Sequence, residues 1–320
     1  MQPRKLIITQ NLEEHLIKSL ESVATGWELI IGKESSVWED HLKDAEIIAG
    51  WKKEITELGL QEDSKLRWLQ TWSAGVNNLP LAELESRRIQ VTSANGVHAF
   101  PISETIFALM LALTRKIHTY VRNQQTKTWH HSGLKLELHE KTVGIIGVGA
   151  IGKETAKLAK AFGMKVLGIR HSGVAEDFVD EMYTTENLNT ILPQCDYVVV
   201  TLPLTKETYH LFGAEQFNLM KPSSFFINIG RGEIAVEEEL IEALREGKIA
   251  GAGLDVFEKE PLPEDNPLWE LENVIITPHT AGSTEKYNQR LIEDIFIPYF
   301  KKYIAGEVPS INLVDYQKGY

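Results

Sequence analysis

Near the end of the sequence lie three side chains of complementary chemistry, a fixed cation, a carboxylate and an imidazole. Arg231 stands between two glycines, Glu260 precedes a proline, and His279 follows Thr277-Pro278. A guanidinium can hold a planar carboxylate by two parallel hydrogen bonds. An imidazole titrates near neutral pH and can donate a proton, and a neighbouring carboxylate favours its charged form. Reduction of a 2-keto acid needs these groups, so we predict Arg231 as substrate anchor, His279 as proton donor and Glu260 as its partner.

A glycine-rich turn earlier in the sequence predicts a nucleotide site. The apolar run 142–146 leads directly into Gly147-Val148-Gly149-Ala150-Ile151-Gly152, and a stretch with helical periodicity follows up to Gly163. Strand, glycine turn and helix in this order form the dinucleotide-binding fingerprint. Gly147 would make the tight turn, Gly149 would let the backbone approach a pyrophosphate, and Gly152 would let helix and strand pack closely. The helix N-terminus would then face the phosphates.

The end of the next predicted strand bears on which dinucleotide is bound. Strand 165–169 runs into Arg170-His171-Ser172, whereas the nearest acids, Glu176 and Asp177, follow several residues later. An acid at the strand end would bind the ribose hydroxyls of NAD, and an arginine suits the 2′-phosphate of NADP. We therefore predict NADP(H) as the favoured cofactor, with NAD(H) left open.

The composition indicates a globular protein and excludes several classes of partner. Of the 320 residues, 43% are apolar and 24% are charged, and the formal net charge is −12. This charge argues against non-specific binding to nucleic acid or to an anionic membrane. No apolar run is long enough to span a membrane and no signal peptide is visible, so a cytoplasmic protein is expected. The single cysteine, Cys195, is predicted to be a packing residue, and no catalytic metal is expected because His130 and His131 have no further ligands nearby.

Apolar strands alternate with amphipathic helices along the whole sequence, which predicts α/β domains with parallel sheets. A strongly apolar helix is expected over residues 102–122, and a second helix, interrupted by Pro298, over residues 285–304. The expected strands fall into two sets, residues 5–9, 27–31, 46–51, 68–72 and 89–92, and residues 142–146, 165–169, 197–202, 225–229, 250–256 and 274–277. The fingerprint opens the second set, so the second set is the predicted nucleotide domain.

Taken together, these motifs resemble the D-isomer-specific 2-hydroxyacid dehydrogenases, and the resemblance covers nearly the whole chain. Residues 73–80 look like the substrate-carboxylate loop of that family, and residues 95–104 look like its crossover into the nucleotide domain. The resemblance implies two Rossmann-like or flavodoxin-like domains. A dinucleotide-binding domain of residues 101–283 is inserted into a discontinuous substrate domain of residues 1–100 and 284–320. It also implies a homodimer.

The resemblance also assigns roles to individual residues. For the substrate it implies Trp51, Gly75 and Val76 besides Arg231. For the cofactor it implies a larger set, in which Asp255 receives the nicotinamide carboxamide. The set is Gly147, Gly149, Ala150, Ile151, Gly152, Arg170, His171, Ser172, Leu202, Pro203, Thr208, Ile229, Gly230, Asp255, His279 and Gly282.

The residues around position 50 narrow the choice of substrate within the resembling family. Phosphoglycerate dehydrogenases usually carry a phosphate-binding arginine here, whereas this chain has Gly50-Trp51-Lys52-Lys53, in which Lys52 or Lys53 is left open as its substitute. A bulky Trp51 suits a small keto acid, so glyoxylate or hydroxypyruvate is the expected substrate, reduced to the D-2-hydroxy acid. Two alternatives stay open: a D-3-phosphoglycerate or general D-2-hydroxyacid dehydrogenase, and a cofactor-sensing binding protein similar to the corepressors of this fold.

Overall fold

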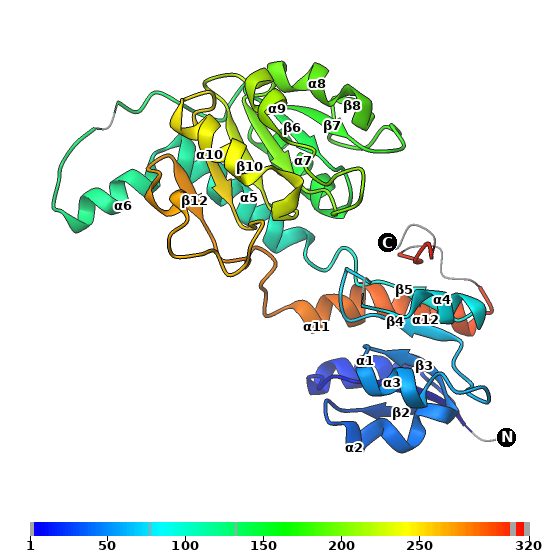
Figure 1. The fold of residues 1–320 in the computed structure, drawn as a ribbon. Coiled ribbons are helices and arrows are strands. Elements are labelled where there is room, and N and C mark those ends of the chain that lie inside the picture. Colours follow the sequence, from blue (N-terminus) through cyan, green and yellow to red (C-terminus); the bar gives the residue numbers. More distant parts are fainter. Residues whose placement is uncertain (1–2, 77, 132, 308–311, 317–320) are drawn as a thin grey trace. The chain divides into compact units, whose positions relative to one another are not determined.

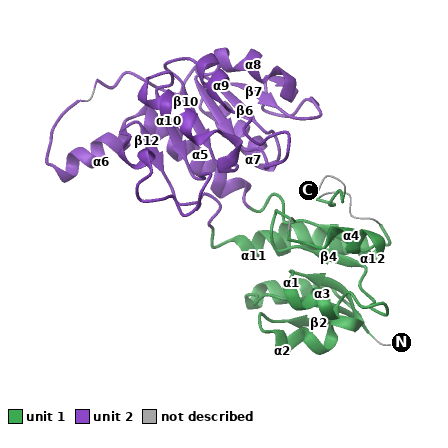
Figure 2. Ribbon diagram, in the orientation of Figure 1, with its two compact units in different colours: residues 1–97, 284–320 green, residues 98–283 purple. Residues whose placement is uncertain are grey.

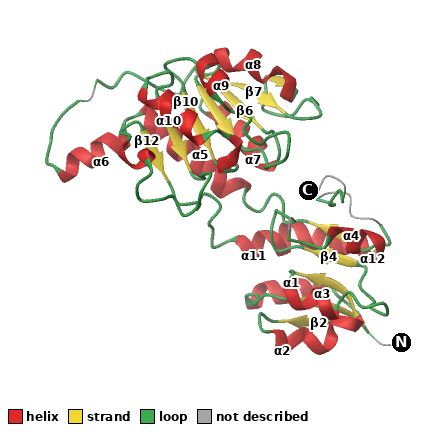
Figure 3. Cartoon of the chain, in the orientation of Figure 1, coloured by secondary structure: helices red, strands yellow, loops and turns green. Residues whose placement is uncertain are grey.

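A computed structural model describes residues 3–76, 78–131, 133–307 and 312–316. The chain forms two compact units, the first made of Met1–Val97 and Thr284–Tyr320 and the second of His98–Ser283 (Figure 2). Helices and strands alternate in both units, and the strands of each unit form one sheet (Figures 1 and 3). The predicted α/β class with two parallel sheets is therefore confirmed.

Unit 1 contains a parallel sheet of five strands in the order β2-β1-β3-β4-β5. Its strands are β1 (Arg4–Ile8), β2 (Trp27–Ile31), β3 (Ala45–Ala49), β4 (Trp68–Gln70) and β5 (Gln90–Thr92). Its helices are α1 (Glu14–Val23), α2 (Ser35–Trp38), α3 (Lys53–Leu58), α4 (Leu81–Ser86), α11 (Tyr287–Gln289) and α12 (Ile297–Ile304). The C-terminal segment completes its core, since Phe296, which lies between α11 and α12, stacks on Trp68 of β4 with 5.1 Å between ring centroids.

Unit 2 contains a sheet of seven strands in the order β12-β11-β10-β9-β6-β7-β8, and every pairing between these strands is parallel. Its strands are β6 (Thr142–Ile146), β7 (Lys165–Ile169), β8 (Glu181–Tyr183), β9 (Tyr197–Val200), β10 (Phe225–Asn228), β11 (Gly251–Leu254) and β12 (Val274–Ile276). Its helices are α5 (Ala99–Thr114), α6 (Ile117–Gln125), α7 (Ala150–Ala161), α8 (Leu188–Ile191), α9 (Ala214–Leu219) and α10 (Glu237–Arg245).

The strand order of unit 2 fixes where a ligand can bind. The chain starts at β6, adds β7 and β8 on one side, and then returns to add β9 to β12 on the other side. Open parallel sheets bind ligands at the carboxyl ends of their strands, beside the strand at which this order reverses. That strand is β6, which the glycine-rich turn follows.

The strands of unit 2 are apolar because both faces of the sheet are covered. One buried cluster contains Phe212, Phe217 and Phe226, and another contains Met110 of α5 and Ala156 of α7. The predicted packing role of Cys195 fits its position, since it is buried in the first cluster and its thiol donates to the carbonyl of Ile191 at 3.2 Å. Burial raises the pKa of this thiol to about 12, so it stays protonated at neutral pH.

The structure differs from the expected elements in three places. The apolar helix ends at Thr114 and α6 begins at Ile117, because Lys116 adopts a left-handed backbone with φ of 54°. Strand β8 was not predicted, since its three residues are partly exposed and carry no apolar run. In the C-terminal stretch, a π-helical turn over Arg290–Phe296 separates α11 from α12 just before Pro298, which cannot donate a backbone hydrogen bond.

Candidate active site

Arg231, Glu260 and His279 follow three neighbouring strands of the unit 2 sheet. Arg231 comes after β10, Glu260 after β11 and His279 after β12, and these strands pair in the order β10-β11-β12. The carboxyl ends of parallel strands lie at one edge of a sheet, so the three loops share that edge. Residues that are far apart in the sequence therefore become neighbours through the topology alone.

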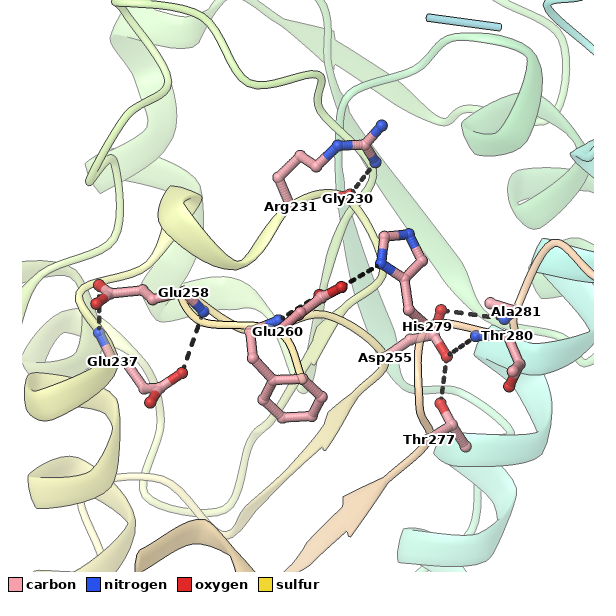
Figure 4. A network of polar contacts seen from close by, with 11 residues as sticks. Gly230, Arg231, Glu237, Asp255, Glu258, Glu260, Thr277, His279, Thr280 and Ala281 are labelled. Atoms are coloured by element: carbon pink, nitrogen blue, oxygen red, sulfur yellow. Dashed lines mark hydrogen bonds and ion pairs between the residues drawn. The ribbon is translucent and has the colours of Figure 1, made fainter. Parts of the chain in front are cut away.

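His279 and Glu260 form a hydrogen-bonded pair. Nδ1 of His279 donates to Oε2 of Glu260 at 2.7 Å, and the other carboxylate oxygen, Oε1, accepts from the backbone N–H of Phe257 at 3.0 Å (Figure 4). One oxygen of Glu260 is thus held by His279, and the other is held by the backbone of its own loop. Since Nδ1 is engaged, Nε2 is the ring nitrogen left to exchange a proton with a ligand. The histidine side chain is half exposed, so a ligand can reach it.

The loop that carries His279 is held by a buried carboxylate. Asp255, only 2% exposed, accepts hydrogen bonds from Oγ1 of Thr277 at 2.5 Å and from the N–H groups of Thr280 and Ala281 at 3.0 Å each (Figure 4). Its carbonyl accepts from the N–H of His279 at 2.9 Å. These contacts hold His279 in a left-handed backbone with φ of 52°, which few non-glycine residues adopt. Asp255 therefore positions His279, and its predicted contact with a nicotinamide carboxamide stays a prediction.

Arg231 is exposed on a turn that a second buried side chain fixes. Oδ1 of Asn228 accepts from the N–H of Gly230, and Nδ2 of Asn228 donates to the carbonyl of Arg231, both at 3.0 Å. Nη1 of Arg231 donates to the carbonyl of Gly230 at 2.6 Å (Figure 4). Asn228 was not among the predicted site residues, although a polar residue at the end of an otherwise apolar strand is a signal in the sequence that could have indicated it.

The two glycines beside Arg231 let three loops meet. A side chain at Gly230 would lie 2.7 Å from the carbonyl oxygen of Leu202, in the loop after β9. A side chain at Gly232 would overlap the backbone of Phe257 and Glu258, in the loop that carries Glu260. Both positions must therefore be glycine for the arginine loop to pack against its neighbours.

The fingerprint residues adopt the geometry that a dinucleotide requires. Gly147 has a φ of +113°, which favours glycine, and a Cβ at Gly152 would lie 2.5 Å from the carbonyl oxygen of Gly147. A Cβ at Gly149, by contrast, would meet no protein atom within 4 Å. This open space lies at the N-terminus of α7, which begins at Ala150, so the turn fits a pyrophosphate. Ile151 lies in the first turn of the same helix.

The loop after β9 is stiffened by its own threonine. Oγ1 of Thr208 donates to the carbonyl of Pro203 at 2.7 Å and accepts from the N–H of Thr205 at 2.8 Å. Thr208 is buried, so its observed contacts shape the loop. Leu202 packs against the core, and Ile229 is buried after β10.

Arg170 lies at the end of β7, beside an acid that is distant in sequence. Nη1 of Arg170 donates to Oε2 of Glu176 at 3.1 Å, and Nζ of Lys153 lies 2.7 Å from the same oxygen. The intervening loop, which contains the exposed His171 and Ser172, turns back on itself and returns Glu176 to the strand end. The separation of Glu176 from the strand in sequence argued against a strand-end acid, but the return of the loop brings its carboxylate to Arg170.

The remaining predicted residues are divided between the two units. Trp51 and Val76 belong to unit 1, where Trp51 packs against a buried cluster and Val76 is itself buried. Gly75 is exposed there, and Asn77, in the same predicted loop, lies outside the described residues. In unit 2, the carbonyl of Gly282 accepts from Nδ1 of His98 at 2.9 Å.

The described residues form neither a metal site nor a membrane-spanning helix. Within the described residues no three His, Cys, Asp or Glu side chains come together so as to hold a metal ion. His130 and His131 are exposed. Of the helices that the structure describes, none has both the length and the apolar character for a membrane crossing.

Comparison with known proteins gives one consistent result. Residues 107–281 match the family model for the NAD-binding domain of D-isomer specific 2-hydroxyacid dehydrogenases. A glyoxylate reductase of Korarchaeum cryptofilum is 34% identical over 98% of this chain and 96% of its own length. A D-3-phosphoglycerate dehydrogenase of Methanocaldococcus jannaschii is 35% identical over 97% of this chain, which spans 59% of that protein. The crystal structure of a D-isomer specific 2-hydroxyacid dehydrogenase from Xanthobacter autotrophicus, in complex with NADPH and MES, has a TM-score of 0.81, 28% identity, and coverage of 99% of this chain and 100% of that one.

Proposed function

The chain belongs to the D-isomer specific 2-hydroxyacid dehydrogenases, and we propose that within this family it reduces glyoxylate or hydroxypyruvate to the D-2-hydroxy acid, with NADP(H) as the favoured cofactor. Membership makes the protein an oxidoreductase that uses a nicotinamide cofactor and acts on a small 2-hydroxy or 2-keto acid. The choice of substrate and the preference for NADP(H) are the parts that we propose.

The observation that carries the proposal is the His279–Glu260 pair at the strand ends next to Arg231. When bound, the reduced nicotinamide supplies the hydride that reaches the keto carbon. Nε2 of His279 donates the proton to the carbonyl oxygen as negative charge develops on it. Glu260 accepts from Nδ1 and so holds the ring, and the exposed guanidinium of Arg231 binds the substrate carboxylate.

The position of Gly50 supports a small, unphosphorylated substrate. Gly50 has a φ of +98°, and a side chain built there would overlap Oγ1 of Thr9. An arginine at this position is therefore disfavoured by both backbone and space. Binding of a substrate phosphate would have to rely on Lys52 or Lys53 instead. The resemblance to a D-3-phosphoglycerate dehydrogenase keeps that reaction as the second candidate.

Two kinds of observation support NADP(H). Arg170 and Lys153 place two cations at the end of β7 and the start of α7, beside the glycine turn. The related Xanthobacter autotrophicus protein was crystallised in complex with NADPH. Cations at this place suit a 2′-phosphate.

The proposal is tested by initial rates of NADPH and NADH oxidation with glyoxylate, hydroxypyruvate and pyruvate, alongside oxidation of 3-phosphoglycerate with NADP and NAD. We expect fast reduction of glyoxylate or hydroxypyruvate, faster with NADPH than with NADH. Activity confined to 3-phosphoglycerate and NAD would overturn both the substrate and the cofactor. Binding of NADPH with no turnover of any acid would favour a cofactor-sensing protein instead.

The proposed assembly is a homodimer, as the family resemblance implies. Light scattering on the purified protein checks it, and a monomer mass at micromolar concentration would contradict it.

A further inference from the structure

One carboxylate in unit 2 lies between two cations at the place where a cofactor's adenosine ribose is expected. Oε2 of Glu176 is 2.7 Å from Nζ of Lys153 and accepts from Nη1 of Arg170 at 3.1 Å. The glutamate side chain is 19% exposed, less than either cation. The two cations therefore share one oxygen of one acid.

This cluster is next to the glycine turn. The carbonyl of Ile169, directly before Arg170, accepts from the N–H groups of Gly147 and Val148 at 3.0 and 2.9 Å. Lys153 is in the first turns of α7, where its N–H donates to the carbonyl of Gly149 at 2.9 Å. A dinucleotide whose pyrophosphate faces the N-terminus of α7 extends its adenosine ribose toward the end of the second strand, which is β7 here.

The charges of Glu176, Lys153 and Arg170 affect whether the ribose of NAD(H) or the 2′-phosphorylated ribose of NADP(H) binds better. Pairing with Lys153 lowers the pKa of Glu176, so the carboxylate is ionised at neutral pH. Two cations and one anion leave a net charge of about +1, whereas a ribose 2′-phosphate carries close to −2. A ribose hydroxyl can donate to a carboxylate, but a phosphate oxygen beside it is repelled.

We propose that Glu176 is a specificity-determining residue that competes with the 2′-phosphate of NADP(H) for Lys153 and Arg170. In NAD(H) the ribose hydroxyls donate to Glu176, and in NADP(H) the phosphate must displace it from the cations. Glu176 therefore limits how strongly the protein prefers NADP(H) over NAD(H). This role of Glu176 rests on one part of the proposed function, the binding of a nicotinamide cofactor, and does not depend on which keto acid is reduced.

The test is to replace Glu176 by glutamine in the full-length protein and to measure dissociation constants for NADPH and NADH by fluorescence titration, without substrate. Glutamine keeps the size of the side chain and removes its charge. We expect NADPH to bind about tenfold more tightly, as the loss of about 1.4 kcal/mol of repulsion would give, and NADH to bind equally or more weakly. The NADPH constant should also become more sensitive to salt.

The matched control is Glu181→Gln. Glu181, in β8, pairs with Lys165 at 2.7 Å at the opposite end of β7, so the variant removes the same charge from an ion pair away from the glycine turn. Its NADPH and NADH constants should match those of the unchanged protein. Equal shifts in this control and in Glu176→Gln would mean that only overall charge matters, which would overturn the proposal.

A double-mutant cycle separates competition from a merely structural role. Arg170→Gln should weaken NADPH binding more strongly in the Glu176→Gln background than alone, because the arginine is then free of its internal partner. If the effects of Arg170→Gln and Glu176→Gln on the NADPH binding free energy were strictly additive, the proposed competition would be contradicted. Glu176→Ala should also tighten NADPH binding. Weaker binding of both cofactors would instead show that Glu176 only holds the loop.

Failure of this inference and failure of the proposed reaction are distinguishable. A protein that shows the predicted shifts in binding but reduces no keto acid contradicts only the proposed substrate. Unchanged NADPH binding in Glu176→Gln, together with intact reduction of glyoxylate or hydroxypyruvate, contradicts only the role of Glu176.

Discussion

At the scale of single residues, the proposed chemistry depends on the side chain of His279 and on the groups that orient it. Glu260 holds its ring, and Asp255 holds its backbone. The ring is therefore fixed before a ligand arrives, which is how an enzyme avoids reorganisation during the reaction.

Replacement of His279 by glutamine should lower kcat about a hundredfold to ten-thousandfold, because the proposed proton donor is lost. The cofactor dissociation constant, measured by fluorescence titration, should stay within about twofold. His139→Gln is the control, since His139 is exposed in the loop before β6, at the opposite edge of the sheet. Unchanged turnover in His279→Gln would remove the residue from the proposed role.

Replacement of Asn228 gives a second test at the residue scale, because the Asn228 side chain holds the turn that carries Arg231. Asn228→Asp keeps the acceptor for Gly230 but loses the donor to the carbonyl of Arg231. A lost partner for a buried polar group costs about 1–3 kcal/mol of folding stability. We also expect KM for the keto acid to rise more than kcat falls, since the proposed role of Arg231 is to anchor the substrate carboxylate.

The matched control is Asn273→Asp. The amide of Asn273 donates to the carbonyls of Leu244 and Ala250, before β11 and away from the carboxyl edge. Thermal unfolding should show a loss of stability in both variants, but KM should rise only in Asn228→Asp. If KM rose in both variants, the cause would be the loss of stability. A local effect on Arg231 would then not explain the result.

At the scale of elements, the glycine turn between β6 and α7 combines two requirements that mutation can separate. Gly152 is needed for the packing of the helix against the turn, whereas Gly149 borders open space. Gly152 thus serves the packing of the fold, whereas the proposed role of Gly149 is to leave space for the pyrophosphate.

Gly149→Ala should therefore leave the melting temperature nearly unchanged but weaken binding of NADPH and NADH at least tenfold, because the methyl group occupies the space for the pyrophosphate. Gly152→Ala should cost about 1–3 kcal/mol of stability, since its Cβ would press on the carbonyl of Gly147. Calorimetry and fluorescence titration measure the two effects. Full cofactor affinity in Gly149→Ala would place the pyrophosphate elsewhere.

At the scale of the whole molecule, each unit has hydrophobic clusters of its own. The clusters of unit 2 draw their buried residues from 106–281, and those of unit 1 from 6–97 and 291–314. Unit 2 is also continuous in sequence, as His98–Ser283. It has the properties of a domain that folds alone.

A fragment of residues 98–283 should thus fold cooperatively and bind NADPH. Circular dichroism during heating should show one sigmoidal transition, and saturating NADPH should raise its midpoint, because a ligand that binds only the folded state stabilises it. The fragment carrying Gly149→Ala is the control for specific binding. A broad, ligand-independent transition would show that the unit needs the rest of the chain.

The sequence by itself determined the fold class and the residue types of the site. Apolar runs separated by helical patterns specify parallel sheets, because such strands must be buried on both faces. The run from Gly147 to Gly152 specified the turn, and isolated polar residues after strands marked Arg231 and His279. These features are local, so neighbouring residues suffice to identify them.

Only the tertiary structure decided which polar groups meet. The contacts of Asp255 with Thr277 and Thr280, and the placing of Glu260 against His279, depend on the pairing of β11 with β12. The return of Glu176 to Arg170 depends on a loop whose path no local pattern specifies. Hydrogen bonds and ion pairs act over a few ångströms in space, whatever the separation along the chain.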